Sequence, residues 1–305
     1  TFSTFTGILF PSSNQYYVLP TSTVPGLNTT LIAPTSHEIA DGSEGHLLYD
    51  VTPRASLDLM GSYLAEHFKG IRSAQQGILS PNLLNTNGAT AGASYQYRIS
   101  PQLTMGVRYV FQYFHYGGGG SDQTQTGYLT AHWDVTEHAG LDLYAGPSYS
   151  IATGGLLPLT GTNQTFKDFT TLGPAFGGTF SFRSDDAVLN LSAQRSVSNG
   201  GGLLMTVMSD YEGAELRRRI SDTWDIVATA GYTRSVAIQP GATKGKIDGQ
   251  SFGTAVEHPI LEKLSVHFEY DYLRQRVNNF VPLGTDLNTN QFSVALFYRI
   301  GEPKL

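Results

Sequence analysis

The sequence predicts an all-β chain: a closed, antiparallel, up-and-down barrel whose strands cross a membrane. Three observations support this fold class. Charged residues make up only 14% of the 305 residues, against about 25% in a typical soluble domain. Apolar and polar side chains alternate along one segment after another. Short polar connections also alternate with long ones along the array.

The low charge is suited to a lipid-facing surface, yet no apolar run approaches the roughly 20 residues that a membrane helix needs. Only helices and closed barrels satisfy every backbone polar group inside a bilayer. Low charge without a helical span therefore favours a barrel. The absence of cysteine excludes disulfide frameworks and thiolate metal sites. A pI near 5.7 and the lack of a basic patch argue against nucleic-acid binding.

The alternation is clearest over residues 103–115, where Leu103, Met105 and Val107 alternate with Thr104 and Gly106. Successive side chains of a strand point to opposite faces, so one face here is apolar and the other polar or small. Aromatic residues repeatedly end the apolar face, as in the girdles of membrane barrels. The same pattern recurs over residues 141–149, 224–232, 264–272 and 292–300.

The connections are of two kinds, as expected for tight periplasmic turns and longer external loops. Short turns are predicted at residues 51–54, 99–102, 135–138, 183–186, 220–223 and 258–261. Longer loops are predicted at residues 69–87, 117–123, 152–170, 198–202, 240–248 and 277–289.

Residues 44–300 supply thirteen strands by this pattern. Because bacterial single-chain barrels have an even number, we predict fourteen, the other one from residues 1–10, with twelve or sixteen as alternatives. Residues 1–43 form an N-terminal segment, the first strand plus a long loop or plug, and residues 301–305 form a tail. Pro147 and Pro174 fall inside predicted strands, and lost alternation at residues 211–215 predicts a β-bulge.

The turn residues 97–101, which lead into the strand Leu103–Val107, and the aromatic-rich strands resemble poorly characterised porin-type barrels of Gram-negative outer membranes. The resemblance covers roughly residues 44–300 and rests on patterns, not signatures. It implies integral location in the bacterial outer membrane, contact with its lipid and lipopolysaccharide, and a pore. Such barrels commonly end on an aromatic residue, whereas this chain continues past Tyr298. A start at Thr1 fits a chain whose signal peptide has been removed, which is a hypothesis.

Charged and histidine side chains on the polar face are the candidate site, because pores select ions with rings of such groups. The alternative is a hydrogen-bonded network that fills the lumen. His267, Glu269 and Asp271 share a face and could bind a cation, but such carboxylates are more often solvated, so we expect no metal and no cofactor. The predicted pore-lining residues are Asp58, Arg98, Arg108, His132, Asp134, Asp142, His267, Glu269, Asp271 and Arg299.

The expected function is a porin-like channel for passive diffusion of small polar solutes or ions. The alternative is a non-conducting barrel that anchors a surface or export complex, and a homo-oligomer is also open. We expect no enzyme, since the sequence has no GxSxG or HExxH motif. For the basic run Arg217–Arg219 we expect a structural role near the periplasmic rim. A soluble β-sandwich or propeller remains the alternative if the strands do not face lipid.

Overall fold

The computed structural model describes residues 2–9, 36–70, 85–117, 119–154, 168–200, 204–221, 223–238, 245–261, 264–278 and 286–298. These residues form one antiparallel sheet of fourteen strands that pair in chain order. The predicted all-β, antiparallel, up-and-down fold and the strand number are confirmed. The strands are β1 (Phe2–Leu9), β2 (Ser36–Thr52), β3 (Ala55–Gly70), β4 (Thr86–Arg98), β5 (Leu103–Tyr116), β6 (Ser121–Thr136), β7 (Ala139–Thr153), β8 (Phe169–Arg183), β9 (Ala187–Gly200), β10 (Leu204–Ser221), β11 (Trp224–Ala237), β12 (Lys246–Leu261), β13 (Leu264–Asn278) and β14 (Asp286–Tyr298).

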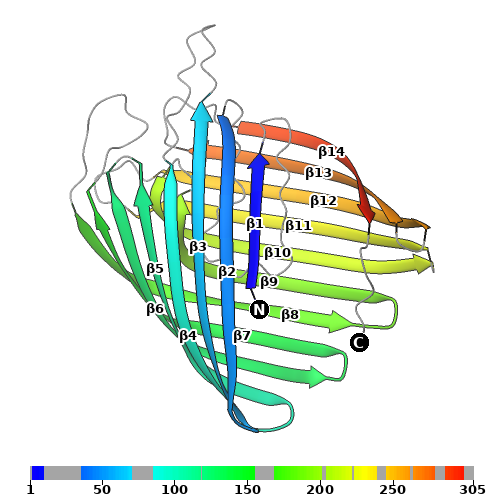
Figure 1. Ribbon diagram of the computed structural model, residues 1–305, viewed down its shortest axis with the longest axis horizontal. Helices are drawn as coiled ribbons and strands as arrows, with labels where there is room; N and C mark the ends of the chain where they lie inside the picture. Colours follow the sequence, from blue (N-terminus) through cyan, green and yellow to red (C-terminus); the bar gives the residue numbers. More distant parts are fainter. Residues whose placement is uncertain are drawn as a thin grey trace, which may run out of the picture.

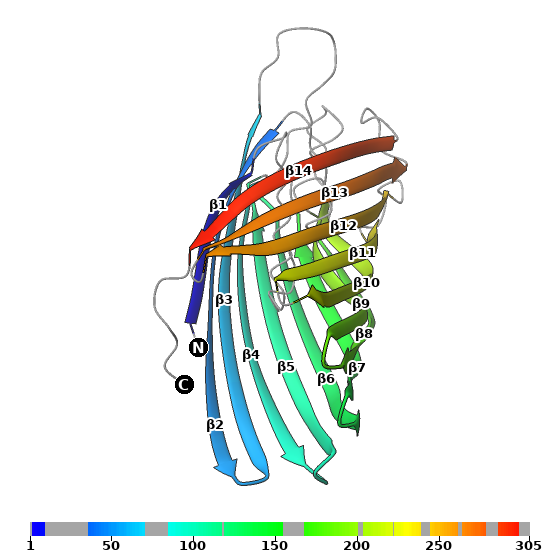
Figure 2. The same cartoon turned by 90° about the vertical axis from the view of Figure 1, so that its right-hand side faces the viewer.

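The sheet curls strongly, and both edge strands, β1 and β14, come to the same side of the molecule (Figures 1 and 2). Each strand pairs with its sequence neighbour, and no pairing of β14 with β1 is present among the described residues. Strands β2–β14 have 13 to 18 residues, more than the roughly 9–11 that a tilted strand needs to cross a bilayer. Within the described ranges no helix is long and apolar enough to span a membrane.

The fourteenth strand, expected from the N-terminal segment, is β1. It pairs with β2 from Phe2 opposite Gly45 to Leu9 opposite Glu38. The paired strands therefore begin before residue 44, which was the predicted start of the barrel. Residues 10–35, the predicted tail 301–305 and the candidate residue Arg299 lie outside the described residues.

Two predictions of local structure are wrong, namely the turn at residues 258–261 and the β-bulge at residues 211–215. Residues 258–261 belong to β12 and not to a turn, and Pro259 pairs with Ser265 beside a register shift near the end of that strand. Residues 211–215 contain no bulge, because β10 keeps a continuous register with both neighbours there. The shifts in β10 lie near its two ends, between Leu204 and Thr206 and between Arg219 and Ser221.

The two strand prolines are accommodated together, since Pro147 of β7 lies directly opposite Pro174 of β8. On the other side of β7, the pairing with β6 is interrupted between Thr126–Ser148 and Leu129–Ala145. Glycine is required at this break, because an ideal Cβ on Gly146 would overlap the carbonyl oxygen of Gly127. The missing proline N–H and this close approach together explain the gap in the ladder.

Candidate functional site

The two faces of the sheet are distinguished by exposure and by contact. On one face large apolar side chains are exposed, among them Leu129 (68%) and Phe292 (79%). The other face carries the carboxylate of Asp122 of β6, which accepts a hydrogen bond from Thr206 of β10, four strands away in the pairing order. Strands this far apart can touch only on the concave side of a curved sheet. We call the concave side the inner face and the convex side the outer face.

The outer face carries the apolar and aromatic belt of a membrane protein. Trp224 stacks on His258 with ring centroids 4.3 Å apart, near the β10–β11 turn. Above the ladder break, an apolar hollow of about 560 Å³ is lined by Tyr109, Leu129 and Pro147, among others. Exposed members of the belt include Leu47, Tyr49, Leu59, Tyr63, Tyr95, Tyr97, Val107, Leu143, Leu172, Phe252, Val294 and Leu296.

Nine of the ten predicted pore-lining residues have their positions on the inner face, because directly opposed strand residues share a face and successive residues alternate. Arg299, the tenth, is not among the described residues. That these side chains line a conducting pore stays a prediction. The nine are Asp58, Arg98, Arg108, His132, Asp134, Asp142, His267, Glu269 and Asp271.

Three of the predicted residues meet on β6 and β7. The Nδ1 atom of His132 lies 2.7 Å from the Asp142 carboxylate, and its Nε2 atom lies 3.3 Å from Asp134. About half of each of these side chains is exposed, so the group lies in open lumen near the β6–β7 turn. Water therefore screens these charges, although they still act on ions that pass close by.

The other predicted residues are more scattered. Asp58 lies 3.4 Å from Nδ1 of His46, which also contacts Glu44 at 2.6 Å. Nε2 of His267 lies 3.8 Å from Glu269. Among the described residues no group of three or more histidine and carboxylate side chains is arranged to hold a metal ion. The contacts thus bring carboxylates to the lumen wall without forming a metal centre.

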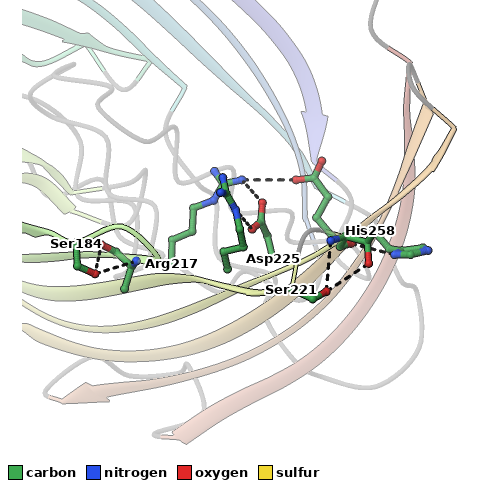
Figure 3. Close-up of polar contacts among 9 residues, drawn as sticks. Ser184, Arg217, Ser221, Asp225 and His258 are labelled. Atoms are coloured by element: carbon green, nitrogen blue, oxygen red, sulfur yellow. Dashed lines mark hydrogen bonds and ion pairs between the residues drawn. The ribbon is translucent and has the colours of Figure 1, made fainter.

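A charged cluster near the turn ends of β10–β12 was not predicted as pore-lining. Nη2 of Arg217 lies 3.3 Å from Asp225 and 3.8 Å from Glu257, and Figure 3 shows its side chain reaching towards Asp225. Arg219 also approaches Asp225, whereas Arg218 has its position on the outer face. Because successive strand residues alternate between faces, the sequence could have shown that Arg217 and Arg219 share one face and that Arg218 lies on the other.

The inner face is acidic overall. Among strand residues whose side chains the structure describes, twelve carboxylates have inner-face positions against five arginines and no lysine. The carboxylates are Glu44, Asp50, Asp58, Glu66, Asp122, Asp134, Asp142, Glu215, Asp225, Glu257, Glu269 and Asp271; the arginines are Arg98, Arg108, Arg183, Arg217 and Arg219.

The part of the inner face nearest the long loops is packed and rich in hydroxyl groups. Thr124 hydrogen-bonds to Ser150 at 2.7 Å, and Thr126 to Ser148 at 2.9 Å. All four side chains are almost fully buried, as is Asp122. The charge pattern of the sequence does not indicate this region, because burial selects small polar groups that satisfy one another.

The outer face of β9–β14 carries a row of alternating charges at directly opposed positions. The opposed pairs include Arg195 with Asp210 (2.8 Å) and Arg234 with Asp248 (3.0 Å). Two residues beside the row add contacts to it, Lys246 to Asp248 (2.8 Å) and Arg274 to Asp286 (2.6 Å). The row lies on the loop side of the apolar belt. Its members are Arg195, Asp210, Arg234, Asp248, Arg276 and Asp286.

No protein-family model and no curated protein sequence matches the chain. Its fold is similar to that of the FrpB iron transporter from Neisseria meningitidis (F3-3 variant), with a TM-score of 0.52 at 12% identity, covering 98% of this chain and 54% of that one. OmpT of Vibrio cholerae gives a TM-score of 0.42 at 12% identity, covering 97% of this chain and 95% of that one. The CymD monoaromatic hydrocarbon channel gives 0.40 at 9% identity, covering 88% and 86%.

The chain spans about half the length of the first solved structures that it matches. At these identities the likeness concerns the fold alone. The chain's own features agree with it: fourteen sequentially paired strands, an exposed apolar belt and a polar concave face. The fold and the belt identify the chain as an integral outer-membrane β-barrel.

Proposed function

We propose that the chain is a channel for passive diffusion of small polar solutes or ions, with a preference for cations. The carboxylate excess of the inner face carries this proposal. Fixed charges along a lumen attract counter-ions and repel co-ions, because the low-dielectric wall focuses the field into the water. Exposed groups such as Asp134 and Asp142 contribute most directly, since ions can approach them.

A planar lipid bilayer that contains the purified protein tests conduction. We expect discrete, reproducible current steps. Absence of steps from protein that is folded and inserted, as judged by different gel mobility before and after boiling, would contradict the proposal. The mobility control is needed because unfolded protein would also fail to conduct.

The alternative is a non-conducting barrel that anchors a surface or export complex. The observation that favours it is the burial of the inner face near the long loops, where Thr124 and Ser150 are almost inaccessible to solvent. A silent but folded barrel would support this alternative, and the next step would be to search for a partner.

Contact with lipid and lipopolysaccharide is a further part of the proposal. The outer charge row has excess cationic side chains nearby, since Lys246 and Arg274 lie beside it. Arginine and lysine at the loop side of the apolar belt are placed to meet phosphate groups of lipid headgroups. Binding of purified lipopolysaccharide, lost when Lys246 and Arg274 are changed to alanine, is the expected result.

A further inference from the structure

The hydrogen-bonded pairing of β8 with β9 does not run the full length of the two strands. These strands pair only over Phe176–Arg183 and Val188–Arg195. Beyond that point β8 stays paired with β7 as far as Phe169, and β9 stays paired with β10 as far as Gly200. The loop-side ends of β8 and β9 therefore separate. We call residues 196–200 and 204–208 the inner flap.

The inner flap lies inside the barrel, behind β8. Val197 and Met208 have outer-face parity, the parity of exposed Leu191 and Leu216 lower in the same strands. Val197 is nevertheless only 5% exposed, and a Cβ added to Gly173 on the inner face of β8 would lie 3.1 Å from Cε of Met208. The outer side of the flap therefore packs against the inner face of β8. The flap and β8 form two layers of the same sheet at this point.

One hydrogen-bonded group fastens the outer side of the flap to the wall behind it, at β6. The hydroxyl of Thr206 donates to Oδ2 of Asp122 at 3.1 Å, while Thr124 donates to Oδ1 of the same carboxylate at 2.9 Å. The fully buried Tyr116 also hydrogen-bonds with Thr206. Bonds to a buried carboxylate are stronger than bonds between neutral groups.

The base of the flap is fixed by a different contact. Arg195 pairs with Asp210 through both its Nε and Nη2 atoms, and its guanidinium lies 5.5 Å from the ring centre of Phe176. These residues stand where the pairing of β8 with β9 ends. Above them Pro174 has no N–H to donate. The flap can therefore move about its base by breaking side-chain contacts, without breaking the β8–β9 ladder.

We propose that the inner flap sets the aperture of the lumen near its loop end, and that Asp122 and Thr206 are the residues that hold it in the narrow position. This inference rests on the proposed channel function. With the flap fastened, the lumen passes small ions; with it released, the lumen passes larger polar solutes.

Thr206→Val tests the fastening, and Thr126→Val is its matched control. Thr126 is equally buried, but it bonds to Ser148 on the adjacent strand of the wall and not to the flap. In bilayers the ratio of wide to narrow conductance states should rise about tenfold or more for Thr206→Val, the usual effect of losing a hydrogen bond to a charged group. Thr126→Val should leave the ratio unchanged. Equal behaviour of the two variants would overturn the proposal.

A second readout does not need conduction. The chain has no cysteine, so Asp122→Cys with Thr206→Cys can be joined by a short thiol cross-linker in native membranes. We expect efficient cross-linking, which each single variant should lack, and loss of the wide state until the link is cleaved. Failure to cross-link in folded protein would overturn the flap position. Cross-linking in a protein that never conducts would instead overturn the channel function and, with it, the aperture role.

Discussion

The inner face has two halves that share the strands β6 and β7 but differ in every other respect. Near the turn, His132, Asp134 and Asp142 are charged or titratable and about half exposed. Near the loops, Thr124 and Ser150 are uncharged and almost fully buried. Because strand alternation places both sets on one face, the difference comes from composition and from what covers each half.

This difference indicates a division of tasks. Carboxylates remain ionised at low cost where water reaches them, so the turn half can select by charge. The loop half excludes water and has small hydroxyl groups that satisfy one another, so it provides the narrow part of the path. Asp122, a carboxylate in the buried half, is stabilised by donors from Thr124 and Thr206.

The two halves meet at the ladder break, and the largest effect is expected there. Gly146→Ala should place a methyl group against the carbonyl of Gly127. Overpacking of this kind typically costs about 1–3 kcal/mol, occasionally more. Urea titration of refolded barrel, followed by gel mobility, should show a clearly lower midpoint. Gly127→Ala, with no atom within 4 Å of the added Cβ, should match the parent; equal loss in both would show that the close approach is unimportant.

A smaller change is expected from neutralising the turn half. Asp134→Asn with Asp142→Asn should reduce the preference for cations, because two exposed carboxylates leave the lumen wall. The reversal potential in a salt gradient measures it. Asp286→Asn removes a charge from the outer face and should leave selectivity as it was. An unchanged reversal potential in the double variant would show that the turn half does not contribute to ion selectivity.

The smallest effect is expected at the rim cluster. Arg217→Ala breaks contacts to Asp225 and Glu257, and all three side chains are partly exposed. Ion pairs that water reaches are worth about 0–1 kcal/mol. Stability should change little, while the two released carboxylates should raise cation preference slightly. Arg218→Ala, on the outer face, is the control for selectivity. A large loss of stability from Arg217→Ala alone would mean that the cluster holds the wall together.

Alternation predicts the strands of the barrel and the face of the nine described pore-lining candidates, because side-chain direction in a strand depends only on parity. The strand number also needed the rule that bacterial single-chain barrels have an even number of strands. Alternation failed at residues 211–215, where a bulge was expected. There the outer face is polar as well, since Asp210 and Glu212 lie on it, and an outer face that is not apolar looks like lost alternation.

The inner flap could not be predicted at all. Parity gives the face of Val197, Thr206 and Met208, but not which part of the sheet covers that face. The bond from Thr206 to Asp122 joins residues 84 positions apart on non-adjacent strands. Neither spacing nor composition carries that information. Pro174 indicated a lost hydrogen bond in β8, but it did not indicate that the loop-side ends of β8 and β9 separate.

The most direct test of the division between the halves compares the Asp134→Asn, Asp142→Asn double variant with Thr206→Val in one bilayer series. Conductance and reversal potential are recorded for both. We predict that the double variant shifts the reversal potential and keeps the conductance states, whereas Thr206→Val populates the wide state and keeps the reversal potential. If both variants changed both quantities together, charge selection and aperture would reside in one region, and the account would be contradicted.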